Sequence, residues 1–225
     1  LVPATGRFAN ISEDVLHGLH LAIKNSVKHM IVEDTGGETQ KTVTAWQSLT
    51  TQRKAKIVVS GPGGSSGNIA ISSSVNKQRI PLIAISSTPT LRDQDDYVFM
   101  IHPPIQAEVK KMLEIFKTRR ITKVAVVYDP ASDTQTIAHN IFVKEFSNIG
   151  MITFSEGYGK DVDYRTLSTK IIASKPEAVY IIAVDKIAGP VVKQLREQKY
   201  TGLLTGFSVA DSDEFLKSAG QHAEN

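Results

Sequence analysis

Two groups of hydroxyl-bearing and glycine residues directly follow apolar segments of the sequence. The first runs from residue 60 to residue 67 (SGPGGSSG), and the second is Ser86-Ser87-Thr88-Pro89. Open α/β sheets bind small ligands at the carboxyl ends of their strands, where hydroxyls and backbone amides can hold a polar group. Neither loop carries an acid, a base or a nucleophile with its partners. The pattern therefore predicts a protein that binds a ligand and does not transform it.

A serine hydrolase is the strongest enzymatic alternative. Residues 63–67 (GGSSG) fit the G-x-S-x-G nucleophile elbow. The elbow serine normally sits immediately past its strand, whereas residues 61–64 intervene here. Its candidate bases downstream are His102, which precedes two prolines, His139, which lies in a predicted helix, and His222. The motif without this context does not predict catalysis.

Other kinds of functional site lack the residues that they need. No lysine follows Gly67, and Ser66 stands where G-x-G-x-x-G requires its third glycine, so a phosphate-binding loop is not predicted. The chain has no cysteine, and His17, His20 and His29 lack a second set of ligands at metal spacing. The net charge is +3 and the basic residues are scattered, which does not suit nucleic acid. We expect no cofactor, no metal and no nucleic-acid partner.

Helical and extended patterns alternate along the 225 residues. Continuous apolar strands, as at residues 82–85, 124–128 and 178–183, separated by helices, predict α/β architecture with parallel sheets covered on both faces. A further strand is expected at residues 30–32. The basic segment 117–122 has no apolar period and marks a boundary. The prediction is two doubly wound parallel-sheet lobes, residues 1–118 and 119–225.

Six segments resemble, in order and spacing, the type I periplasmic solute-binding proteins of the leucine/isoleucine/valine-binding family, which serve ABC importers. The segments are residues 2–9, 33–35, 60–66, 80–89, 97–99 and 123–128. The resemblance implies a binding protein whose two lobes close on a small molecule, and which an ABC permease in the membrane then recognises. It also implies a periplasmic protein or a cell-surface lipoprotein, whose leader is absent from this chain. A sensory ligand-binding module of a receptor has the same fold and stays open as an alternative.

Compared with the family, the chain resembles a fragment. Family members begin with a full strand before the turn at Thr5-Gly6, where this chain has only Leu1 and Val2, and they continue past the position of Asn225. The first lobe is therefore expected to be incomplete, with exposed sheet edges.

In the first lobe, the family's clamp on a ligand carboxylate falls on Ser65 or Ser66 and on Ser86 and Thr88, with Ser87 between them. Helix N-termini expose unpaired N–H groups and a partial positive charge, so the amides before the next helix can hold a carboxylate without Lys or Arg. The alternative is that these residues only form tight turns.

In the second lobe the sequence departs from the family. Asp133 and Val184, which is followed by Asp185, stand where amino-acid-binding relatives place aromatic residues. The acid that meets a ligand ammonium in the family falls near Phe207 and Ser208, with Asp211 a few residues further on. The three aspartates are expected to be new polar contacts or helix caps. The sequence therefore does not require an α-ammonium on the ligand.

The expected ligand is a small polar metabolite, either a branched-chain amino acid or another small carboxylate or amide. Its apolar part is expected to lie against Ile11 and Phe207, although single apolar residues of this kind also occur as plain core.

Overall fold

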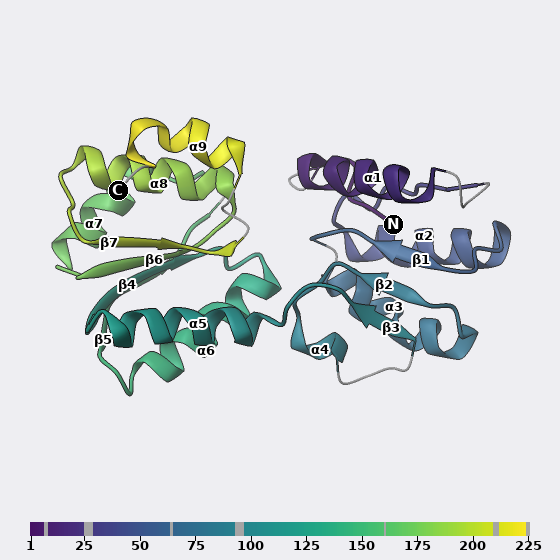
Figure 1. Ribbon diagram of the computed structural model, residues 1–225, viewed down its shortest axis with the longest axis horizontal. Helices are drawn as coiled ribbons and strands as arrows, with labels where there is room; N and C mark the ends of the chain where they lie inside the picture. Colours follow the sequence, from purple (N-terminus) through teal and green to yellow (C-terminus); the bar gives the residue numbers. More distant parts are fainter. Residues whose placement is uncertain are drawn as a thin grey trace. The chain divides into compact units, whose positions relative to one another are not determined.

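The computed structural model describes residues 1–6, 9–24, 29–63, 65–92, 97–159, 161–208 and 212–223. The chain divides into two compact units, Leu1–Ile105 and Gln106–Asn225, and each contains a parallel β-sheet with helices (Figure 1). This confirms the predicted α/β class. Within the described residues, no helix combines the length and the apolar character needed to cross a membrane.

The sheet of the first unit has three parallel strands in the order β1-β2-β3. The strands are β1 (Val58–Ser60), β2 (Leu82–Ala84) and β3 (Val98–Met100), and the helices are α1 (Ala9–Ile23), α2 (Thr39–Gln47), which continues into a π-helical turn (Ser48–Gln52), α3 (Ser65–Gln78) and α4 (Pro89–Arg92). Trp46 of α2, Ile71 and Val75 of α3 and Leu82 of β2 are fully buried together. The apolar stripes of α2 and α3 thus form the core beside the sheet.

The strand expected at residues 30–32 is not formed. Ile31 and Val32 are exposed, and the pairing occurs two residues later, in an isolated parallel bridge between Val2 and Asp34. There the N–H of Val2 donates to the carbonyl of Glu33 at 3.1 Å. The prediction was wrong because a short apolar run forms a strand only where a neighbouring strand lies alongside it.

The second unit has a four-stranded parallel sheet in the order β5-β4-β6-β7. Its strands are β4 (Lys123–Tyr128), β5 (Met151–Gly157), β6 (Ala178–Ile182) and β7 (Leu203–Gly206), and its helices are α5 (Ile105–Thr118), α6 (Asp133–Phe146), α7 (Tyr164–Ala173), α8 (Asp185–Glu197) and α9 (Asp213–Ala219), followed by a 3₁₀ turn (Gly220–His222). Helices lie on both faces of this sheet (Figure 1). The second unit is therefore doubly wound, as predicted.

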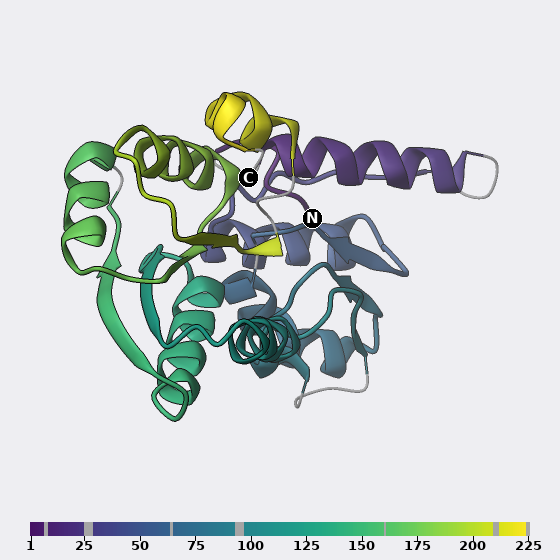
Figure 2. The same ribbon diagram turned by 60° about the vertical axis from the view of Figure 1, so that its left-hand side comes forward.

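Alternate side chains of the central strands enter different cores, because successive residues of a strand point to opposite faces. Val179 and Ile181 pack with residues of α7 and α8. Tyr180 lies instead in an aromatic cluster with Phe116 of α5 and Phe142 of α6, and the rings of Tyr180 and Phe142 are 4.9 Å apart. Figure 2 looks along α5 and shows α6 beside it.

The unit boundary lies one helix earlier than the sequence predicts. Helix α5 was placed at the end of the first lobe, residues 1–118, whereas the chain divides after Ile105. Phe116 is fully buried against Phe142, Phe146 and Tyr180, all of the second unit. The apolar face of α5 was visible in the sequence, but the unit against which it packs was not.

Replacing Gly67 with alanine is expected to destabilise the first unit. A Cβ at residue 67 would lie 2.5 Å from Oγ1 and 2.7 Å from Cβ of Thr42. Thr42 is buried and its hydroxyl donates to the carbonyl of Glu38 at 2.9 Å, so it cannot move aside without losing that bond. Overpacking of this kind lowers the unfolding free energy by about 1–3 kcal/mol.

The matched control is Gly18→Ala in α1, where the added Cβ meets no described atom within 4 Å. This change should raise the stability by about 1 kcal/mol, the usual helix-propensity gain. Fluorescence of the single tryptophan, buried Trp46, follows urea unfolding of the first unit in both variants. A Gly67→Ala protein as stable as the wild type would show that α2 and α3 are not in close contact.

Candidate functional site

The first unit brings the two hydroxyl-rich loops together. Strands β1 and β2 are parallel, with Ser60 opposite Ala84, so the segments that follow them leave the same edge of the sheet. The hydroxyl oxygens of Ser65 and Ser86 are 3.0 Å apart, within hydrogen-bonding distance. The contact between these loops was expected from the rule that parallel strands end at a common edge.

Helix α3 begins at Ser65, inside the first hydroxyl- and glycine-rich loop. Ser65 and Ser66 thus belong to its first turn, where backbone N–H groups have no partner inside the helix and carry a partial positive charge. Ser65 is half-buried and Ser66 is exposed. This turn can accept a carboxylate beside the Ser65–Ser86 pair.

Thr88 presents a buried hydroxyl at the same edge. It is 1% exposed and precedes Pro89, the first residue of α4, so it stands where a threonine normally caps a helix. Its backbone N–H donates to Oγ of Ser86 at 3.4 Å, but its own Oγ1 has no hydrogen-bond partner in the described part of the chain. Buried hydroxyls are nearly always satisfied, so the Thr88 hydroxyl has a hydrogen bond left to make.

Asn68 is a second polar group of this region, and it was not among the predicted site residues. Its Oδ1 accepts a hydrogen bond from Ser60 at 2.7 Å, and its buried amide nitrogen has no partner among the described residues. Asn68 shares the buried face of α3 with Ile71 and Val75. A polar residue at an apolar position of this stripe was the signal that could have revealed it.

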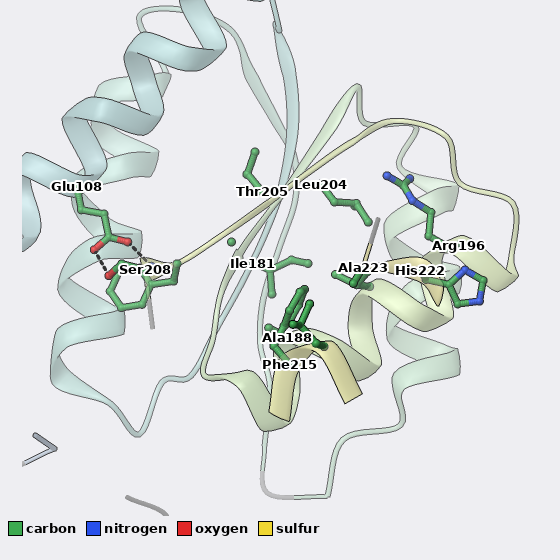
Figure 3. A pocket seen from close by; sticks show the side chains of 14 residues that line it. Glu108, Ile181, Ala188, Arg196, Leu204, Thr205, Ser208, Phe215, His222 and Ala223 are labelled. Carbon is green, nitrogen blue, oxygen red and sulfur yellow. Dashed lines mark hydrogen bonds between the residues drawn. The ribbon is translucent and has the colours of Figure 1, made fainter. Parts of the chain in front are cut away.

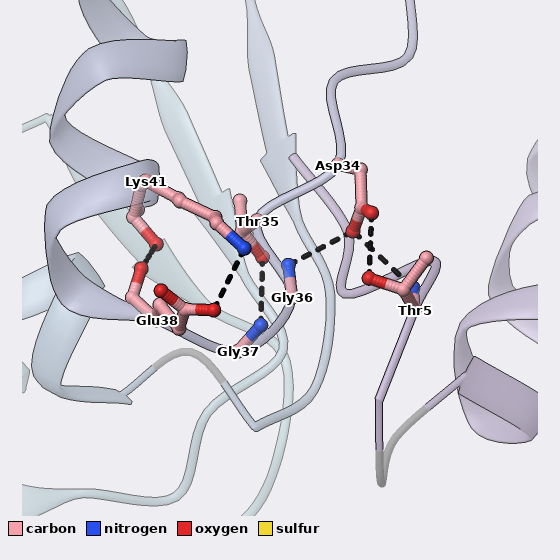
Figure 4. Close-up of polar contacts among 8 residues, drawn as sticks. Thr5, Asp34, Thr35, Gly36, Gly37, Glu38 and Lys41 are labelled. Carbon is pink, nitrogen blue, oxygen red and sulfur yellow. Dashed lines mark hydrogen bonds and ion pairs between the residues drawn. The ribbon is translucent and has the colours of Figure 1, made fainter.

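The turn at Thr5-Gly6 is held by the carboxylate of Asp34 (Figure 4). Asp34 accepts hydrogen bonds from Oγ1 of Thr5 at 2.7 Å and from the N–H groups of Gly36 at 2.8 Å and Thr5 at 3.3 Å. The bond from Gly36, followed by that from the Thr5 hydroxyl, lowers the pKa of Asp34. The carboxylate of Asp34 therefore stabilises this turn.

Ile11, which was predicted to contact the apolar part of the ligand, is half-buried on α1.

In the second unit, Asp133, Val184 and Phe207 follow β4, β6 and β7, whose parallel arrangement brings their carboxyl ends to one edge of the sheet. Asp133 is exposed as the first residue of α6, Val184 is the half-buried N-cap residue of α8, and Phe207 is buried. Asp185 opens α8, and the position of its side chain is not described. Asp211 lies outside the described residues.

Of these candidates, Phe207 lines a cavity of about 540 Å³ in the second unit. Glu108 of α5 and Ser208 also line this cavity, and the two carboxylate oxygens of Glu108 accept hydrogen bonds from the backbone N–H and the hydroxyl of Ser208 (Figure 3). Glu108 was not among the predicted site residues. It is 100 residues from Ser208 in the sequence, and no local motif connects the two.

The described hydrogen bonds do not pair Ser65 with a histidine. Both ring nitrogens of His139 are engaged, Nε2 with Oγ of Ser155 at 2.7 Å and Nδ1 with Oδ1 of Asn140 at 3.0 Å. Burial lowers the pKa of His139. The serine of the G-x-S-x-G match instead contacts Ser86, so the described part of the chain does not assemble the elements of a hydrolase around it.

Two units with parallel sheets, whose strand ends carry hydrogen-bonding groups, define an α/β ligand-binding protein. The chain belongs to the periplasmic binding protein family, whose pattern it matches over residues 1–225. This family consists of binding proteins, in agreement with the prediction that the ligand is not transformed.

Individual relatives are similar over almost the whole chain. An amino acid binding protein from Pseudomonas aeruginosa is 29% identical over an alignment of 237 residues. The alignment covers 97% of this chain and 62% of that protein. The structure of the leucine binding protein LivK from Thermotoga maritima matches with a TM-score of 0.85 at 18% identity. The match covers 98% of this chain and 65% of that one.

A solute binding protein of an ABC transporter from Rhodopseudomonas palustris, in complex with 3,4-dihydroxybenzoic acid, has a TM-score of 0.83 at 18% identity; the match covers 99% of this chain and 64% of that one. The present chain thus spans less than two thirds of the length of each of these three proteins. The likeness in structure confirms the type I periplasmic-binding-protein fold that the sequence resemblance implied.

Proposed function

We propose that this protein is the extracytoplasmic solute-binding component of an ABC importer and that it binds a small molecule with a carboxylate or carbonyl end. Membership of the periplasmic binding protein family supports the class of function and a location in the periplasm or at the cell surface. Closure of the two lobes on the ligand and recognition by a permease belong to the same proposal and rest on the family alone.

The observation that carries the proposal is the buried hydroxyl of Thr88, which no described residue satisfies. It lies in the loop that also contributes Ser86 to the contact with Ser65 in the first turn of α3. These are neutral donors, and together with a helix N-terminus they can stabilise an anionic oxygen without a lysine or arginine.

The relatives support a carboxylate as the shared feature of the ligand. One is described as a leucine binding protein and another was solved with 3,4-dihydroxybenzoic acid. These two molecules differ in their apolar part and in the ammonium group, but both carry a carboxylate. We therefore assign the carboxylate to the first unit and expect the second unit to select the rest of the molecule.

Titration calorimetry tests the proposal with leucine, its deaminated counterpart 4-methylpentanoate, and 3,4-dihydroxybenzoate. The protein is expected to bind at least one of them, and mass spectrometry should recover that compound chemically unchanged. Failure to bind any carboxylate in this set would contradict the proposed ligand class. Hydrolysis of an ester or amide that is abolished by Ser65→Ala would instead support the hydrolase.

A further inference from the structure

The second unit gathers basic residues at the amino edge of its sheet, where its four strands begin. The strands are parallel, so the helix that precedes each of them ends at this edge. Between the last turn of each of these helices and the first residue of the next strand lie seven exposed cations that take part in no ion pair of the described residues. We call this set the basic edge, and its members are Lys117, Arg119, Arg120, Lys123, Lys144, Lys175 and Lys199. Residues that are scattered in the sequence are thus brought together by the fold.

The acidic residues of the same segments do not neutralise the basic edge. They are three, Glu145, Glu177 and Glu197, against seven cations, which leaves an excess of four positive charges. The carboxylate of Glu177 accepts the backbone N–H groups of Thr122 at 2.7 Å and Lys123 at 3.1 Å. These bonds join the segment before β4 to the segment before β6, so the cations of the two segments are held close to each other.

Three members of the basic edge have a backbone conformation that favours glycine. Arg120, Lys175 and Lys199 have φ values of 55°, 53° and 62°, and each is the second residue after its helix. This position is usually glycine, because a Cβ costs free energy in the left-handed region. In the first unit, Lys54 and Arg79 have the same conformation. Every described residue other than glycine with a positive φ is therefore a lysine or an arginine, so these positions combine an unfavourable backbone with a positive charge.

The negative end of a helix dipole favours a cation after a helix, but this effect does not account for the whole set. Lys123 is the first residue of β4, and Arg119 and Arg120 place a second cation at the end of α5, beyond the one in its last turn, Lys117. The seven cations come from the ends of four helices and from a strand, so they are spread along the edge and do not converge on one small anion. This arrangement suits an extended anionic surface.

The same segments offer no platform on which a nucleic-acid base could stack. Their aromatic residues are Phe116 and Phe146, which are fully buried, and Tyr200, which is half-buried and donates its hydroxyl to the carbonyl of Pro176 at 3.2 Å. Proteins that bind single-stranded nucleic acid combine basic residues with exposed aromatic side chains. The basic edge therefore favours a partner that presents charge alone.

We propose that the basic edge docks this protein on an anionic phospholipid surface. The choice of a membrane as the extended anion rests on the proposed function, which places the protein beside one. Each cation near such a surface adds to the attraction, which falls off within a Debye length and weakens as salt is added. The opposite edge of the same sheet, where the strands end, stays free for the ligand. Docking thus keeps the binding protein close to the membrane without covering its ligand site.

The test measures sedimentation of the chain with vesicles of phosphatidylcholine that contain about one third phosphatidylglycerol, and with vesicles of phosphatidylcholine alone. The wild type is expected to bind only the anionic vesicles. The first edge variant combines Arg120→Gly, Lys175→Gly and Lys199→Gly, which removes charge and places glycine where the backbone favours it. Its affinity for the anionic vesicles should fall by about ten-fold to a hundred-fold, while its melting temperature should not fall.

The matched control removes the same charge from the opposite ends of the same three helices, α5, α7 and α8. It combines Lys110→Gln, Arg165→Gln and Lys186→Gln, all at exposed positions. This variant should bind the anionic vesicles as tightly as the wild type does. A second edge variant leaves the left-handed residues in place and should lose as much affinity as the first. It combines Arg119→Gln, Lys123→Gln and Lys144→Gln.

Three results would overturn the docking proposal. The first is a wild type that does not bind the anionic vesicles, including one that binds a single-stranded oligothymidylate instead. The second is an equal loss in the control and in the edge variants, because the vesicles would then respond only to net charge. The third is unchanged binding in both edge variants.

Titration of the first edge variant with the carboxylates named under the proposed function separates the two proposals. The variant is expected to bind them as the wild type does. Carboxylate binding without vesicle binding would overturn the docking proposal alone. Vesicle binding that depends on the basic edge, in a chain that binds no carboxylate, would contradict the proposed ligand class and leave the docking surface in place.

Discussion

Replacing Phe116 with alanine is expected to lower the unfolding free energy of the second unit by about 3–5 kcal/mol. Phe116 is fully buried, and its ring makes edge contacts with Phe142 at 5.8 Å, Phe146 at 5.9 Å and Tyr180 at 6.4 Å. The loss combines the transfer of the ring to water with the cavity left among three rigid neighbours. Because domains are stable by only about 5–15 kcal/mol in total, this change removes a large share of the stability.

Hydrogen exchange of the β4 and β6 amides, together with urea unfolding followed by circular dichroism, measures this loss. Tyr180→Phe is the matched control, because the Tyr180 hydroxyl is buried without a partner among the described residues. Removing an unsatisfied hydroxyl while keeping the ring should leave the unit at least as stable as the wild type. A loss below about 1 kcal/mol for Phe116→Ala would show that α5 does not pack into the second unit as described.

Most of the fold could be predicted because its signals are local. The apolar run that became β6 is fully buried on both faces, as are residues 124–127 of β4, and this pattern is typical of a doubly covered parallel sheet. Short elements were predicted less well. Helix α9 was not predicted, and the strand expected at residues 30–32 did not form. The boundary was misplaced by the length of α5, because an amphipathic helix shows which face it buries and not the partner of that face.

The candidate site was predictable only where it depends on local signals. Ser65 and Ser86 meet because parallel strands end together, a rule that needs no knowledge of distant contacts. The unsatisfied state of Thr88 and Asn68 depends on their surroundings, which sequence alone does not contain. The hydrogen bond between Glu108 and Ser208 joins residues 100 positions apart in the sequence, so no local pattern predicts it. The roles of Asp133, Val184 and Asp185 in binding stay predictions.

Replacing Thr88 with valine is expected to weaken ligand binding by about ten-fold to a hundred-fold. A neutral hydroxyl that donates to a charged acceptor contributes about 1.5–3 kcal/mol, which corresponds to this range of affinity. Valine keeps the branched shape of the side chain, and the hydroxyl that it removes has no described partner in the free protein. The unliganded protein should therefore be as stable as the wild type or more stable.

Calorimetric titration of Thr88→Val and wild type with the tightest-binding carboxylate of the set, alongside melting curves without ligand, tests the central claim most directly. Thr90→Val, an exposed change on the adjacent helix α4, is the control and should behave as the wild type. The account predicts a ten-fold to hundred-fold loss of affinity for Thr88→Val with an unchanged or raised melting temperature. An unchanged affinity together with a clearly lower melting temperature would contradict it, because Thr88 would then be a turn former and the ligand would bind elsewhere.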